Sequence, residues 1–130
     1  MSLVTPSPGT PRVPFSFELY PPRSASSEEA LHETVRHLAA AGPDFLSVTY
    51  GAGGSSGGRS LEVLRRVRAA VPSDFCVIAV GGVTSEQDVQ DRIDAGATLV
   101  QGYTAFLYEG PTWAARINRL RRRRLRRAAR

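Results

Sequence analysis

The sequence predicts a single-domain α/β protein in which four strands alternate with helices along 130 residues. Apolar or alternating runs typical of strands recur along the chain, and an amphipathic helical pattern follows each of them. A glycine-rich or polar cluster stands where each strand ends. Such regular alternation implies parallel strands with right-handed crossovers, so we expect the four clusters to lie at one edge of the sheet.

The first strand is expected over residues 13–20 (VPFSFELY), where apolar and polar side chains alternate until Pro21-Pro22 ends the run. A capping pair, Ser26 and Glu29, then predicts the start of a helix. Its inward face consists of Leu31, Val35 and Leu38. Residues 44–50 (DFLSVTY) predict the second strand.

A glycine-rich loop over residues 51–58 separates the second strand from a helix that is expected to begin at Ser60. Leu61, Leu64, Val67 and Val71 form the inward face of this helix. Residues 75–80 (FCVIAV) are almost wholly apolar, which is typical of a strand buried in a parallel sheet. Gly81 and Gly82 follow this third strand.

The third helix is expected to begin at a capping pair, Thr84 and Gln87, and to end at Gly96. Residues 97–103 (ATLVQGY) predict the fourth strand. A last helix is expected with Pro111 in its first turn, and it runs into the arginine-rich C-terminal segment. Its packed side chains are expected to be Trp113, Ile117 and Leu120.

The net charge of +5 is unevenly distributed. All 17 basic residues are arginines; nine lie in residues 116–130, which carry no acid, whereas residues 1–115 hold eight arginines against twelve carboxylates. The single Cys excludes an internal disulfide framework, and we expect no metal site. No apolar run approaches the roughly 20 residues of a membrane span, so the expected location is the cytoplasm, with peripheral contact at the inner face of the membrane as an option.

Different segments of the chain resemble two families of flavoenzymes. Residues 15–54 carry FSFELYPPR and SVTYGAGG, and this segment resembles the start of methylenetetrahydrofolate reductase, an FAD enzyme of folate one-carbon metabolism. Residues 59–119 carry DFCVIAVGGV and RIDAGATLVQGYTAFLYEGP. This segment resembles the C-terminal region of the quinone-linked dihydroorotate dehydrogenases, FMN enzymes of pyrimidine biosynthesis.

Both resemblances imply a (β/α)8 barrel, for which 130 residues provide about half of the usual ~250. The expected organisation is a disordered leader (1–12), one half-barrel domain (13–120) and an arginine-rich tail (121–130). Within the domain, 13–54 is reductase-like and 59–120 dehydrogenase-like, with the join near 51–58. Such a half of a TIM barrel could close by forming a homodimer, or the four units could form a flavodoxin-like open sheet.

The dehydrogenase resemblance implies that backbone amides at two turns hold the phosphate of FMN. These turns are Gly81-Gly82, after the third strand, and Tyr103-Thr104, after the fourth. The glycine usual after Tyr-Thr in that family is Ala105 here, which could crowd the turn. The reductase resemblance implies instead an FAD site, with Glu18 as a catalytic acid and Thr49 in contact with the flavin.

Neither reaction is expected to be complete in one copy of the chain, so whether it is an enzyme stays open. The dehydrogenase needs a flavin-contacting lysine, and the sequence has no lysine. A non-catalytic chimeric or designed half barrel is therefore an alternative function. For the arginine-rich tail we expect weak association with acidic surfaces rather than specific nucleic-acid binding, because no aromatic residues are interleaved with it.

Overall fold

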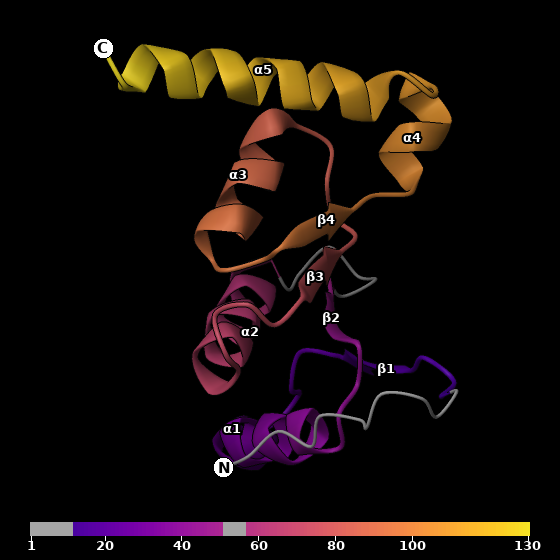
Figure 1. Ribbon diagram of the computed structural model, residues 1–130, viewed down its shortest axis with the longest axis vertical. Helices are drawn as coiled ribbons and strands as arrows, with labels where there is room; N and C mark the ends of the chain where they lie inside the picture. The colour runs from indigo at the N-terminus through magenta and orange to yellow at the C-terminus, as the bar shows by residue number, and fades with distance from the viewer. Residues whose placement is uncertain (1–11, 51–56) are drawn as a thin grey trace.

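The computed structural model describes residues 12–50 and 57–130, and it contains a four-stranded parallel sheet with helices between the strands (Figure 1). The described elements, in chain order, are β1 (Ser16–Leu19), α1 (Ala25–Ala40), β2 (Phe45–Thr49), α2 (Gly57–Ala70), β3 (Val77–Val80), α3 (Glu86–Asp94), β4 (Leu99–Gln101), α4 (Thr104–Glu109) and α5 (Trp113–Ala128). The predicted α/β class and the four strands are confirmed.

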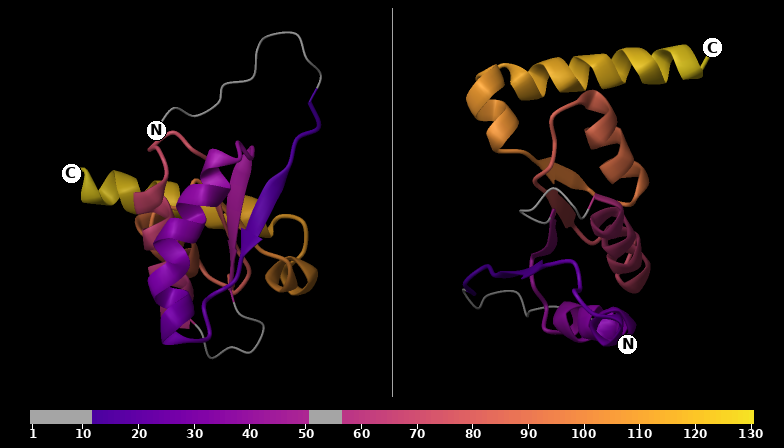
Figure 2. Two further views of the ribbon diagram at one scale, coloured as in Figure 1. Left: turned by 90° about the horizontal axis from the view of Figure 1, so that it is seen from below. Right: turned by 180° about the vertical axis from the view of Figure 1, so that it is seen from behind.

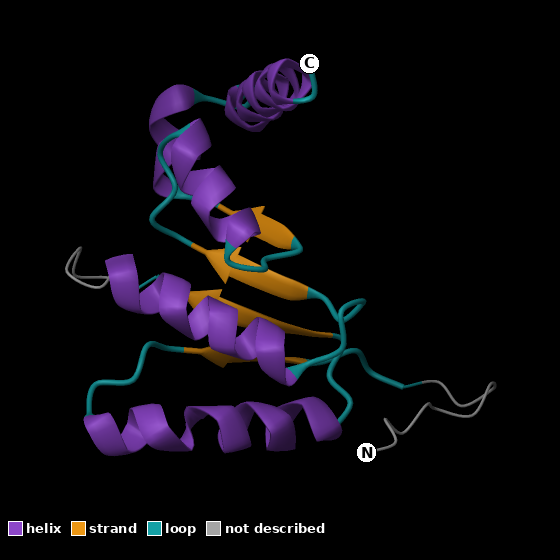
Figure 3. Cartoon of the chain, turned by 90° about the vertical axis from the view of Figure 1, so that its left-hand side faces the viewer, coloured by secondary structure: helices purple, strands orange, loops and turns teal. Residues whose placement is uncertain are grey.

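The strands lie side by side in chain order, β1-β2-β3-β4, and each pairs in parallel with its neighbours. Helices α1, α2 and α3 lie on one face of the sheet (Figure 3). Sequential order with helices on one face is the arrangement of a (β/α)8 barrel, whereas a flavodoxin-like sheet has the order 2-1-3-4-5 and helices on both faces. The fold is therefore consistent with half of a TIM barrel and not with the flavodoxin-like alternative.

The core lies between the sheet and these helices. Leu46 and Val77 are fully buried and face α2, where Leu64 and Val67 are buried as well. The helix α1 adds Val35, also fully buried. The spacing of these helical residues follows the 3.6-residue period, which explains why the inward faces predicted from sequence are the buried ones.

The opposite face of the sheet carries the alternate residues of each strand. The strand register aligns Glu18, Ser47, Ile78 and Leu99 in one row across that face. Leu99 is 55% exposed. Figure 2 shows that α1, α2 and α3 leave this face uncovered. In a complete barrel the same face would line the interior.

The helix starts differ from the predicted capping pairs. The side chain of Ser24, not Ser26, caps α1 by accepting from the Ser27 amide, at 3.2 Å. A capping box between Ser85 and Asp88, rather than Thr84 and Gln87, starts α3. Several hydroxyl residues precede each helix, so spacing alone did not select the residue with extended backbone that the N-cap needs.

The C-terminal region contains one helix more than expected, since α4 follows β4 directly. Pro111 lies before the N-cap Thr112 rather than within the first turn of α5. Trp113 and Ile117 are buried as predicted, but Leu120 is 42% exposed, so its predicted packing is wrong. The arginine-rich segment continues α5 as helix as far as Ala128.

Contacts with α3 fix the position of α5. The guanidinium of Arg121 donates to the Gln90 side chain at 3.2 Å, and Arg124 donates to Gln87 at 2.7 Å. Within the residues that the structure describes, α5 included, no helix combines the length and apolar character needed to cross a membrane.

The predicted leader and join lie mainly outside the described residues, which begin at 12 and omit 51–56. Arg12 is described, and its guanidinium forms an ion pair with Asp44 and donates to the carbonyl of Gly42 at 3.1 Å. This contact holds Arg12 against the α1–β2 connection.

Candidate functional site

The six predicted site residues all lie at or beyond the C-terminal ends of the strands. Glu18 and Thr49 occupy the ends of β1 and β2, Gly81-Gly82 follows β3, and Tyr103-Thr104 follows β4. Because all four strands are parallel, their carboxyl ends lie along one edge of the sheet, and α/β proteins bind ligands beyond this carboxyl edge. The topology thus confirms the common edge that the alternating pattern predicted.

The turn after β3 depends on glycine. Gly81 and Gly82 both have positive φ, 83° and 61°, which residues with a side chain rarely adopt. A Cβ atom on Gly82 would also lie 2.6 Å from the ring of Tyr50 and 2.9 Å from a guanidinium nitrogen of Arg92. Gly82 is therefore required both by its backbone conformation and by the close approach of these two side chains.

Arg92 holds this turn from the side of α3. It is only 5% exposed, and one of its nitrogens donates to the carbonyls of Gly81 (3.1 Å) and Gly82 (2.8 Å). Its other terminal nitrogen donates to the Asp88 carbonyl at 2.8 Å. The ring of Tyr50 lies over the guanidinium, 5.3 Å from it, within the range of a cation–π contact.

The turn after β4 is packed against the turn after β3. The Gly81 amide donates to the carbonyl of Gln101, the last residue of β4, at 2.9 Å. Val83 and Ala105, which directly follow the two turns, are buried in one cluster with Trp113. The Ala105 methyl group is therefore directed into the core, and the expected crowding of the turn by this residue does not occur.

Amide groups remain available at both turns. The structure gives no protein acceptor for the amides of Gly82 and Val83, or for those of Thr104 and Ala105, among the described residues. The latter two open α4, whose first amides have no partner within the helix. Gly82, Tyr103 and Thr104 are exposed, so an anion can reach this side of the edge from solvent.

Glu18 and Thr49 are brought together at the other half of the edge. The carboxylate of Glu18 accepts a hydrogen bond from the Thr49 hydroxyl and another, at 3.1 Å, from the hydroxyl of Tyr20. The hydrogen bond with Glu18 raises the pKa of Tyr20 above its ordinary value, and the negative charge of Glu18 and a slight desolvation of the Tyr20 hydroxyl act in the same direction. Thr49 pairs with Val80, the residue before Gly81, so the two halves adjoin through β2 and β3.

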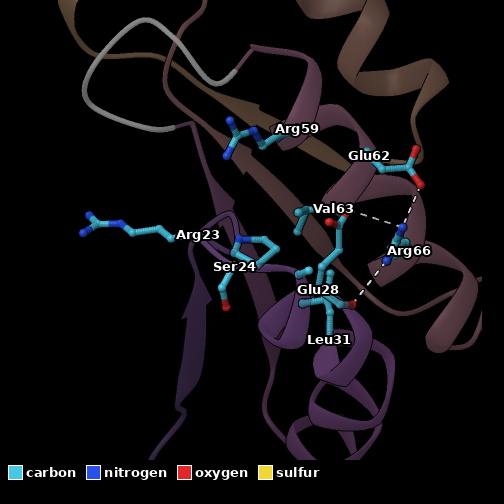
Figure 4. Close-up of a pocket in the computed structure, with 10 residues that line it drawn as sticks. Arg23, Ser24, Glu28, Leu31, Arg59, Glu62, Val63 and Arg66 are labelled. Atoms are coloured by element: carbon cyan, nitrogen blue, oxygen red, sulfur yellow. Dashed lines mark hydrogen bonds and ion pairs between the residues drawn. The ribbon is translucent and has the colours of Figure 1, made fainter.

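A separate hollow of about 360 Å³ lies between the first turns of α1 and α2 (Figure 4). Its lining includes Arg23, Glu28, Glu62 and Arg66, and none of the predicted site residues. Arg66 donates to Glu62 at 3.2 Å and lies 3.5 Å from the Glu28 carboxylate. Arg66 thus neutralises these two carboxylates, whereas Arg23 and Arg59, which also line the hollow, form no ion pair with another described residue.

Sequence reasoning missed two residues of the site, Arg92 and Tyr50. Arg92 falls between Val89 and Ile93 on the apolar arc of α3. A charged residue is rarely buried unless its charge is paired, so an arginine on the inward face of this helix is the sequence feature that could have identified Arg92. Tyr50 gave none, because an aromatic residue at a strand end is ordinary.

Comparison with known proteins now adds to this geometry. The sequence profile of the family described as dihydroorotate dehydrogenase matches residues 39–125, which is more than half of the chain. The dihydroorotate dehydrogenase (quinone) of Pseudarthrobacter chlorophenolicus is 60% identical over 94 residues, covering 69% of this chain and 26% of that protein.

Two further relatives carry the same description. The protein of Leifsonia xyli subsp. xyli is 67% identical over 73 residues, 53% of this chain and 21% of its own length. That of Kineococcus radiotolerans is 45% identical over 92 residues, 68% of this chain and 25% of its own. This chain thus spans about a quarter of the length of the curated relatives it matches.

The extent of the match bears on the two-family interpretation. The matched residues begin at 39, so they take in β2 and overlap the segment 15–54 that resembles methylenetetrahydrofolate reductase. No comparison supports a reductase segment. The profile also extends into α5, as far as residue 125, and includes both the glycine turn and the Tyr-Thr turn. On this match, the chain belongs to the dihydroorotate dehydrogenase family.

Proposed function

We propose that this chain binds the phosphate group of FMN and forms the phosphate-binding region of a flavin-dependent oxidoreductase of the dihydroorotate dehydrogenase type. One observation carries the proposal: the turns after β3 and β4 are packed together and present amides of Gly82 and Thr104 that have no acceptor among the described residues. Amides at such turns are well suited to an anion, because each donates a hydrogen bond and glycine allows close approach.

The proposed reaction class follows from family membership, and the named relatives are dihydroorotate dehydrogenases (quinone). When bound, a flavin supplies the hydride chemistry of such an oxidoreductase. The residues of this chain would bind and orient it: Gly81, Gly82, Tyr103 and Thr104 around the phosphate.

Flavin titration of the purified full chain tests this function. We expect FMN to bind more tightly than riboflavin, which has the same ring system but no phosphate, and to raise the melting temperature. A cooperative thermal transition with no affinity for FMN would contradict the proposal. It would favour the alternative of a non-catalytic half barrel.

A matched pair of glycine variants sharpens this test. Gly82→Ala would place a methyl group against Tyr50 and Arg92, and we expect it to weaken FMN binding by about tenfold or more. Gly42→Ala imposes similar backbone strain, at φ 75°, but has open space around its Cβ and lies at the α1–β2 connection. We expect it to lower stability by roughly 1 kcal/mol and to leave FMN binding unchanged. Equal effects of both variants on FMN binding would argue against a site at Gly82.

The contact between Glu18 and Thr49 is the observation in favour of the reductase-like alternative. It would give Glu18 the role of acid and Thr49 that of flavin contact, with FAD as cofactor. FAD therefore belongs in the same titration as a competitor. Tighter binding of FAD than of FMN, together with weakening by Glu18→Gln but not by Gly82→Ala, would favour this alternative.

The proposal includes two partners besides flavin. A second copy of the chain could cover the open face of the sheet and pair with its outer strands, because among the described residues no strand pairs with the outer side of β1 or β4. With a twofold axis along the strands, β4 of each copy would lie beside β1 of the other and close an eight-stranded parallel barrel. The arginines of α5 are proposed to associate weakly with acidic surfaces, and loss of binding to anionic vesicles on adding salt would support this.

A further inference from the structure

Arg92 is a buried cation whose contacts are unusual. Its side chain is 5% exposed, yet all three of its hydrogen bonds go to neutral backbone carbonyls, of Gly81, Gly82 and Asp88. No carboxylate lies within 4 Å of it among the described residues. Burying an unpaired charge costs free energy. Because no described carboxylate neutralises the charge of Arg92, that charge is left available to an anion from outside the protein.

The direction of the neighbouring amides follows from the planarity of the peptide bond. None of the described peptide bonds is cis, so the N–H of each unit points opposite to its C=O. The carbonyls of Gly81 and Gly82 both point toward the Arg92 guanidinium. The amides of the same two peptide units belong to Gly82 and Val83, and they therefore point away from Arg92.

In this arrangement the Arg92 guanidinium polarises both peptide units in the same direction. A guanidinium bonded to the carbonyl oxygens draws electron density toward that end of each peptide unit. The N–H groups at the other end become stronger donors, since hydrogen bonds in a chain polarise one another. A phosphate on that side would meet two donors aligned by the same positive charge.

The surroundings explain why a guanidinium suits this position. Its planar fork reaches the turn with one nitrogen and the Asp88 carbonyl in α3 with another, which a lysine ammonium on a single nitrogen does not reproduce. The Tyr50 ring covers its face, and Gly82 leaves no side chain between them. The sequence supplies no lysine at this or any other position.

We propose that Arg92 is a positioning residue for the phosphate ligand: it orients the Gly82 and Val83 amides toward the ligand and strengthens them with its unpaired charge. The identity of that ligand as FMN rests on the proposed function, whereas the orientation of the amides does not. Arg92 is not a catalytic residue, because it acts through the turn and not on reacting atoms.

The test compares Arg92→Gln and Arg92→Lys with a matched control. Arg68, in the last turn of α2, is also a carbonyl-binding arginine, but it donates to Phe75 (2.9 Å) and to Pro72 in the α2–β3 connection, at the opposite end of the strands. Arg68→Gln therefore removes similar contacts without touching the turn. All variants are measured as full chains labelled with ¹⁵N.

Two readouts separate positioning from general stability. In the first, the amide chemical shifts of Gly82 and Val83 are recorded without ligand; we expect Arg92→Gln to move them and Arg68→Gln to leave them in place. In the second, FMN and riboflavin are titrated separately. We expect Arg92→Gln to weaken FMN by on the order of tenfold with riboflavin unchanged, Arg92→Lys to recover some of that loss, and Arg68→Gln to leave the ratio unaltered.

Each alternative outcome has a defined meaning. Amide shifts of Gly82 and Val83 that stay unchanged in Arg92→Gln would overturn the inference whether or not FMN binds. Equal weakening of FMN and riboflavin would also overturn it, because that result indicates a structural role alone. If the unaltered chain binds no FMN while the amides still move in Arg92→Gln, the proposed function fails and the orienting role of Arg92 stands. If Arg92→Gln does not fold, both readouts are taken from Arg92→Lys.

Discussion

At the scale of single residues, the carboxylate of Asp88 organises the start of α3 by accepting several hydrogen bonds. One oxygen of Asp88 accepts from the amides of Thr84 (3.0 Å) and Ser85 (2.9 Å) and from both of their hydroxyl groups. Burial raises the pKa of Asp88, but these four hydrogen bonds lower it more, so that the pKa lies below its ordinary value of 3.8. The capping box directly follows the Gly81–Gly82 turn and thus fixes the chain leaving it.

The first residue-scale prediction concerns Asp88→Asn. Asn keeps the shape but loses the charge that the four donors favour, so we expect the free energy of unfolding to fall by about 1 kcal/mol at neutral pH. The pKa of Asp88 is lower in the folded than in the unfolded protein. The carboxylate therefore contributes fully to the free energy of unfolding above its unfolded-state pKa, and this contribution is lost as pH falls through the folded-state pKa. Urea unfolding across a pH series measures the difference between the two proteins.

The control for this prediction is Asp94→Asn, at the other end of α3. A carboxylate there faces the negative end of the helix dipole, so its removal is expected to cost no stability. A difference between Asp88→Asn and the unaltered chain that persists at the lowest pH would contradict the role assigned to the charge.

Glycines divide at this scale into predictable and unpredictable cases. Gly81 and Gly82 could be placed at a turn from the sequence, because a glycine pair follows an apolar strand, and their role toward an anion stays a prediction. The reason that Gly82 must be glycine could not be predicted, because its neighbours Tyr50 and Arg92 come from the end of β2 and from α3. Such contacts arise only when the strands and helices are packed.

At the scale of elements, Trp113 fixes α5 against β4. Its ring lies next to Gly102, where a Cβ atom would come within 2.6 Å of it. The indole is buried together with Ile117 and Val89, so the first turns of α5 pack on α3 while the later turns carry exposed arginines. The sequence pattern predicted this division but extended the packed region too far, by the turn that includes Leu120.

The element-scale prediction is that Gly102→Ala displaces Trp113 and loosens α5. We expect a loss of roughly 1–3 kcal/mol in the free energy of unfolding, the usual cost of forcing extra volume into a packed site. Because Trp113 is the only tryptophan, its fluorescence reports the change directly. Gly110→Ala has open space at its Cβ but strains the backbone at φ 82°, so as a control we expect it to lower stability by roughly 1 kcal/mol and to leave the Trp113 emission unchanged. A Gly102→Ala protein with unaltered emission and stability would show that the ring does not need this glycine.

At the scale of the whole molecule, the open face and the two free edges of the sheet are the main features. The strand order places β1 and β4 at opposite edges, and the uncovered face carries Ile78 and Leu99. A sheet that leaves apolar side chains such as these uncovered, beside unpaired outer strands, tends to associate, and the proposed homodimer would cover the side chains and pair the strands.

The whole-molecule prediction is that the chain has twice the mass of one copy in solution, as measured by light scattering with and without FMN. Leu99→Glu places a charge on the open face, and we expect it to shift the protein to the monomer. Leu125→Glu is a matched control, since Leu125 is 56% exposed on α5 and Leu99 55%. A chain that is monomeric at all concentrations, with or without FMN, would contradict closure by a second copy.

The sequence by itself determined the α/β class, the four parallel strands, the inward faces of α1 and α2, and the common edge on which the candidate site residues lie. These depend on periodicity and on glycine-rich clusters, which are local properties. The tertiary structure alone decided that the sheet order is sequential, that Ala105 points into the core, and that Arg92 and Tyr50 hold the Gly81–Gly82 turn. Contacts of this kind join residues far apart in the chain, and their geometry is set only when the elements pack against one another.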